Sequence, residues 1–95
     1  MNTPDFLDAI FGRHQGPSAD WQNYTWTLYI ESDRQGGWYL TEDDTSPDLY
    51  LVGYQAASPE APFEIDRTFT ASELVAWVSS GGSGQFIRNA QQLDR

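Results

Sequence analysis

The clearest pattern in the chain is a strict alternation of side-chain types over positions 24–32. One set of alternate positions is apolar or aromatic: Tyr24, Trp26, Leu28 and Ile30. The intervening positions are occupied by Thr25, Thr27, Tyr29 and Glu31. Because successive side chains point to opposite faces of a strand, this pattern predicts a half-buried β-strand.

Three more strands are predicted downstream, at 38–41, 49–55 and 63–69. The turn-forming run at 33–37 connects the first two strands as a hairpin. The stretch 49–55 has apolar or aromatic residues on both faces, and 63–69 alternates again. We therefore expect an antiparallel meander of four strands.

Helices are predicted on either side of these strands. The first covers 4–11, with Thr3 as its cap, Pro4 in its first turn and Gly12 after its end. The strongest boundary signal lies at Thr70, where the run to Glu73 matches a capping box before a helix at 71–80. A glycine-rich loop at 81–84 and a last helix at 85–93 complete the chain.

The predicted fold is one α+β domain over residues 1–95, in the order α-β-β-β-β-α-α, with the helices covering one face of the sheet. The composition supports such a core: four Trp, five Tyr and five Phe supply large apolar area. The chain has no cysteine, its first residues do not resemble a signal peptide, and no apolar run approaches the length of a membrane span. These features favour a cytoplasmic protein.

The charge of the chain excludes some classes of partner. The formal net charge is −9, and all basic residues are arginines. Direct binding of nucleic acid or of an anionic membrane needs basic patches that contact phosphates. Neither partner is therefore expected.

Candidate chemistry is sparse. His14 is the one histidine and is expected in a loop. The run from Gly81 to Gln85 lacks the last glycine of a nucleophile elbow, and the acidic stretch 42–48 lacks the ligand spacing of an EF-hand. We therefore predict no enzymatic activity, no cofactor and no metal site.

Acidic residues interleaved with tyrosines form the strongest positive feature. We expect them to cluster around the ends of the first three strands, on a sheet face that also presents tyrosines. Tyr50 and Tyr54 are further candidates for that face. The candidate partner-binding residues are Glu31, Asp33, Glu42, Asp43, Asp44, Asp48, Tyr29 and Tyr39. Aromatic side chains beside charged groups are typical of interaction hot spots.

These features favour a non-enzymatic inhibitor whose acidic surface binds a basic, nucleic-acid-binding face of a partner protein. In size and composition, though not in any motif, the chain is similar to phage anti-defence proteins of the anti-CRISPR and anti-restriction DNA-mimic type. An immunity or antitoxin protein that neutralises a basic nuclease is an alternative. A small adaptor that binds through an exposed tyrosine face is another. Oligomeric state is left open.

Overall fold

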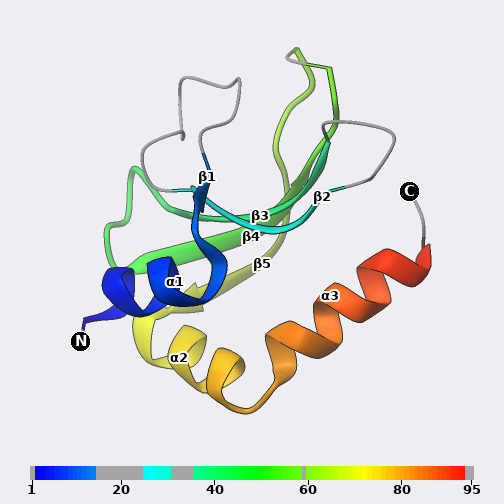
Figure 1. Cartoon of the computed structure of the whole chain (residues 1–95). Helices are drawn as coiled ribbons and strands as arrows, with labels where there is room; N and C mark the ends of the chain where they lie inside the picture. The colour runs from blue at the N-terminus through cyan, green and yellow to red at the C-terminus, as the bar shows by residue number, and fades with distance from the viewer. Residues whose placement is uncertain (1, 15–24, 31–35, 59, 94–95) are drawn as a thin grey trace.

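An antiparallel sheet with helices on one side forms the protein (Figure 1). The computed structural model describes residues 2–14, 25–30, 36–58 and 60–93. The elements are α1 (Thr3–Phe11), β1 (Arg13–His14), β2 (Thr25–Ile30), β3 (Gly37–Glu42), β4 (Leu49–Gln55), β5 (Glu64–Thr70), α2 (Ala71–Ser79) and α3 (Gly82–Leu93). The strand order β1-β2-β3-β4-β5 follows the sequence. The predicted order of helices and strands is confirmed, and a short strand, β1, joins the sheet at its edge.

The first helix begins one residue earlier than predicted. Asn2, not Thr3, is its N-cap, and the side-chain oxygen of Asn2 accepts a hydrogen bond of 3.1 Å from the backbone N–H of Asp5. Gly12 ends the helix with a positive φ of 71°. The backbone then continues directly into β1, so His14 lies in a strand paired with Thr25 rather than in the predicted loop.

A β-bulge changes the alternation predicted for β2. Thr27 pairs with Tyr39, but Tyr29 pairs with Trp38, so Leu28 is the extra residue between them. A bulge rotates the side chains that follow it relative to the regular pleat. As a result Tyr29 packs at the border of the core, whereas Ile30 is 39% exposed. The predicted orientation of these two residues is therefore wrong.

The central strands β3 and β4 are buried on both faces. Their core side carries Trp38, Leu40, Tyr50, Val52 and Tyr54. The other side carries Tyr39 and Thr41, which are 2% and 4% exposed. On that side Phe63 lies so close to Gly53 that an added Cβ would be 2.7 Å from its ring.

The capping box at the start of α2 is confirmed. The Thr70 hydroxyl accepts from the backbone N–H of Glu73, and the Glu73 carboxylate accepts from the backbone N–H of Thr70. Gly81, with φ at 86°, reverses the chain after α2. Helix α3 begins at Gly82 and not after Gly84, because the run predicted as a loop forms its first turn.

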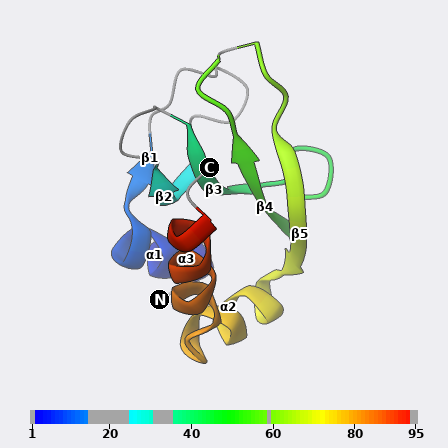
Figure 2. The same cartoon turned by 90° about the vertical axis from the view of Figure 1, so that its right-hand side faces the viewer.

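All three helices lie on the same side of the sheet (Figure 2). Leu7 of α1, Leu74 of α2 and Ala90 of α3 are buried against the strands. The largest fully buried side chain is Trp26, whose indole N–H donates to the carboxylate of Asp8 on α1. This contact joins the first helix to the sheet.

Candidate partner-binding surface

The β3–β4 connection, which carries three of the predicted site residues (Asp43, Asp44 and Asp48), is an ordered turn. The backbone N–H of Asp43 donates to the carbonyl of Leu49, and that of Leu49 donates to the carbonyl of Ser46, at 3.0 and 2.9 Å. The Asp43 carboxylate accepts from both the backbone N–H and the hydroxyl of Thr45, each at 2.9 Å. The hydrogen bond from the Thr45 backbone N–H has the largest effect on the pKa of Asp43, followed by the bond from the Thr45 hydroxyl. Both hold this pKa below its usual value.

The carboxylates of this turn differ in their hydrogen bonding and exposure. The carboxylate of Asp43 is hydrogen-bonded to Thr45 within the connection, whereas Asp44 and Asp48 are exposed. Glu42 ends β3 and is half-buried opposite Tyr50 of β4. Asp44 and Asp48 are therefore the residues of the turn that a partner can reach first.

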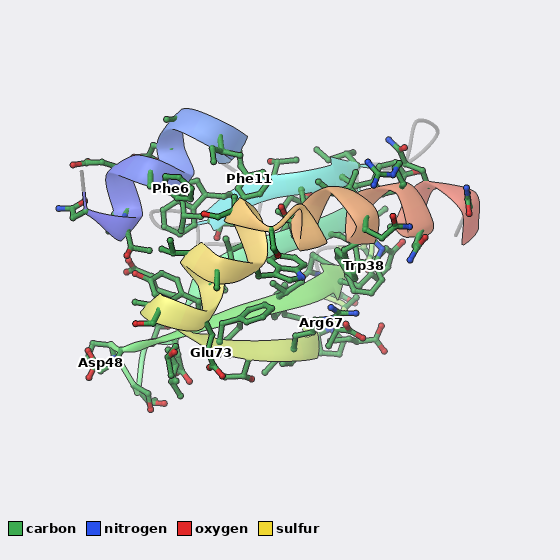
Figure 3. All side chains as sticks on the ribbon, turned by 90° about the horizontal axis from the view of Figure 1, so that it is seen from below. Phe6, Phe11, Trp38, Asp48, Arg67 and Glu73 are labelled. Atoms are coloured by element: carbon green, nitrogen blue, oxygen red, sulfur yellow. The ribbon has the colours of Figure 1, made fainter. Side chains whose placement is uncertain are left out.

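One more carboxylate lies at this end of the sheet. Leu49, which directly follows the β3–β4 connection, pairs with Thr70, the N-cap of α2, so Glu73 in the first turn of α2 lies near that connection. Asp48 and Glu73 are both found at the lower left in Figure 3. We call this surface the acidic end, and its residues are Glu42, Asp43, Asp44, Asp48 and Glu73. The partial positive charge at the N-terminus of α2 stabilises carboxylates near it.

The described arginine side chains lie elsewhere. Arg67 is in β5, away from Asp48 and Glu73 in Figure 3. Its guanidinium group lies over the ring of Phe86 in α3, with 4.9 Å to the centroid, and pairs with Asp66 at 3.1 Å. Arg88 is in the second half of α3 and donates to Gln85 of the same helix. Within the described side chains, the acidic end therefore carries negative charge without a neighbouring arginine.

Part of the predicted acidic cluster falls within the described residues. Glu42 ends β3, and Asp43, Asp44 and Asp48 follow it in the connection to β4, so the structure brings these four together at one end of the two strands. Glu31 and Asp33 lie outside the described residues.

The predicted exposed tyrosine face is wrong. Tyr39, Tyr50 and Tyr54 are 2%, 5% and 7% exposed, and Tyr29 packs at the border of the core. The prediction assumed that helices would bury one face of the sheet and leave the other open. Both faces of β3 and β4 are buried instead, so these rings contribute to stability.

Burial of Tyr39 gives the protein a measurable sensitivity to alkali. Burial, and next the charge of Tyr54, raise the pKa of Tyr39 above its usual value. The resulting stability is complete below the unfolded pKa of ~10 and is lost as pH rises through the higher folded pKa. We expect the melting temperature to fall above pH ~10, and to fall less steeply in Tyr39→Phe.

The chain suits this measurement because it contains neither lysine nor cysteine. Tyrosines are then the side chains that titrate between pH ~9 and ~12. Thermal melts followed by circular dichroism at intervals over this range test the expectation. An equal fall of the melting temperature with pH in the parent and in Tyr39→Phe would contradict the expectation.

The outer edge of the sheet is a second exposed surface. Strand β5 is exposed along most of its length, and Ile65 is 58% exposed. The strand is interrupted by a bulge at Asp66, between the pairs Val52–Arg67 and Gly53–Ile65. A bulge that carries charged side chains hinders the addition of another strand to an edge. We therefore do not assign partner binding to this edge.

Two classes of site were sought in the described part of the chain. No group of three or more His, Cys, Asp and Glu side chains within it could hold a metal ion. No helix within it is long and apolar enough to cross a membrane. Comparison with protein-family models, curated proteins and solved structures gives no match to this chain.

Proposed function

We propose that the protein is a non-enzymatic binding protein that inhibits a partner by covering its basic, nucleic-acid-binding face. The observation that supports this proposal is the acidic end, where five carboxylates lie without a described arginine beside them. Carboxylates held at such a surface attract a basic face over several ångströms and select it against acidic ones. The mode of action is that of anti-CRISPR and anti-restriction DNA mimics.

The order of the β3–β4 turn also supports the proposal. The hydrogen bonds around Asp43 fix the backbone that carries Asp44 and Asp48. A fixed array loses less conformational entropy on binding than a flexible loop would. The adaptor alternative loses its support, because it depends on tyrosines that are buried.

The matched experiment compares two variants that each remove two negative charges. Asp44→Asn/Asp48→Asn changes the acidic end, and Glu60→Gln/Glu64→Gln changes exposed residues near the β4–β5 connection. Affinity capture from host lysate at low and high salt, followed by mass spectrometry, identifies the partner. We expect the first variant to associate roughly tenfold more slowly at low salt, and the second to resemble the parent.

Competition distinguishes inhibition of a nucleic-acid enzyme from other uses of the same surface. DNA or RNA should displace the protein from its partner, and binding should weaken steeply with added salt. A basic nuclease toxin among the captured proteins would instead favour the immunity class. Equal effects of the two variants, with no dependence on salt, would contradict a role for the acidic end.

A further inference from the structure

Tyr50 is a residue of the hydrophobic core whose hydroxyl group has no hydrogen-bond partner among the described residues. The side chain is 5% exposed and packs in the core cluster. Its hydroxyl group forms no hydrogen bond with the described residues. Buried polar groups in folded proteins are nearly always hydrogen-bonded, so an exception calls for a physical explanation.

The Tyr50 hydroxyl lies close to the carboxylates of the acidic end. Glu42 is its direct partner across the β3–β4 pair, and Asp48 precedes it by two residues. Burial, and then the charges of Glu42 and Asp48, raise the pKa of Tyr50. The carboxylates are thus near the hydroxyl without being hydrogen-bonded to it.

We propose that Asp48 and the Tyr50 hydroxyl, with Glu42 beside them, form a binding site for the guanidinium group of one partner arginine. This inference rests on the proposed function and specifies which residue of a basic face the acidic end recognises. The Asp48 carboxylate accepts two N–H bonds side by side, and the Tyr50 oxygen accepts a third. The arginine side chain thereby supplies a hydrogen-bond partner that the described residues do not give to this hydroxyl.

The oxygen atoms fit arginine better than other cations. Guanidinium is a planar fork of five N–H donors, whereas the ammonium group of lysine is a compact and strongly hydrated point charge. Calcium takes about six to eight oxygen ligands, which two carboxylates and a phenol do not supply. The site therefore discriminates between arginine and lysine on the partner.

The test uses acetyl-arginine amide as the probe and follows the backbone amide signals of residues 48–50 by nuclear magnetic resonance. Asp48→Asn and Asp44→Asn each remove one charge from the same exposed turn, but only Asp48 neighbours Tyr50. We expect Asp48→Asn to weaken binding about threefold and Asp44→Asn less than about 1.5-fold. Tyr50→Phe should weaken it about fivefold, and the corresponding lysine compound should bind less tightly than the probe.

Thermal melts separate recognition from folding. Because the Tyr50 hydroxyl has no hydrogen bond within the described part of the chain, Tyr50→Phe should melt at the parent temperature or slightly higher while binding the probe less tightly. Equal losses in Asp44→Asn and Asp48→Asn, or an unchanged affinity in Tyr50→Phe, would overturn the site. If the protein binds the probe but no salt-sensitive partner is captured, the proposed function is refuted and the arginine site is not. If Tyr50→Phe binds the captured partner as tightly as the parent does, the arginine site is refuted and the proposed function is not.

Discussion

Trp26→Ala is expected to leave the protein largely unfolded or only marginally stable at 25 °C. Trp26 has no exposed surface and contributes to the core between β2 and the helices. Truncating a buried tryptophan costs ~3–5 kcal/mol, because contacts are lost and a cavity is left. Domains of this kind are stable by ~5–15 kcal/mol in total. Urea unfolding followed by far-ultraviolet circular dichroism measures the loss.

Asp8 separates the hydrogen bond of Trp26 from its packing. Asp8→Ala leaves the indole N–H without its acceptor in a buried position and should cost ~1–3 kcal/mol. Asp8→Asn retains an acceptor oxygen and should cost less. Trp77→Ala is the packing control, since Trp77 is only half-buried and should lose less than Trp26→Ala. A loss below ~1 kcal/mol in Trp26→Ala would contradict its place at the centre of the core.

The elements with strong local signals were predictable from the sequence. The second helix carries its own start signal, since Thr70 and Glu73 satisfy each other's backbone donors whatever surrounds them. Likewise the run of apolar and aromatic residues at 49–55 predicted a strand with these bounds, and β4 has them. In both cases the information lies within a few consecutive residues.

The features that were missed depend on contacts between distant segments. No residue near Leu28 indicates a bulge; it becomes visible only in the register of β2 against β3. The glycines at 82 and 84 predicted a loop. Gly82 instead begins a helix, and glycine is suited to this position because a Cβ there would lie 2.5 Å from the Trp77 side chain. Burial of Tyr39 depends on what covers the second face of the sheet, which strand periodicity does not specify.

The candidate surface was predictable in part. The acidic turn 42–48 was recognisable from its composition, but the different roles of Asp43 and Asp48 needed the hydrogen bonds of the turn. Glu73 was predicted as a capping residue of the second helix and not as a neighbour of that turn. Tyr50 was taken for part of an exposed tyrosine face; its cross-strand pairing with Glu42 could have indicated its place in the acidic end, had the register been known.

Gly37→Ala is expected to destabilise the protein by about 3 kcal/mol, because Gly37 faces backbone and not side chains. A Cβ at this position would collide with the carbonyl oxygen of Tyr29 and would lie 2.8 Å from the Cα of Ile30. These atoms belong to the β2 segment that follows the bulge. A side chain could rotate away, but backbone atoms in a paired strand can move only if the pairing loosens.

Gly84→Ala is the matched control, since it adds the same methyl group where there is room. The nearest atom to a Cβ at Gly84 is the Arg88 Nη1 at 3.6 Å, and the position lies in the first turn of α3. Alanine there should stabilise the protein by about 0.5 kcal/mol, since glycine loses more backbone entropy in a helix. Urea midpoints of the two variants should therefore move in opposite directions from that of the parent. A Gly37→Ala protein as stable as the parent would mean that β2 does not approach β3 as closely as the pairing Ile30–Gly37 requires.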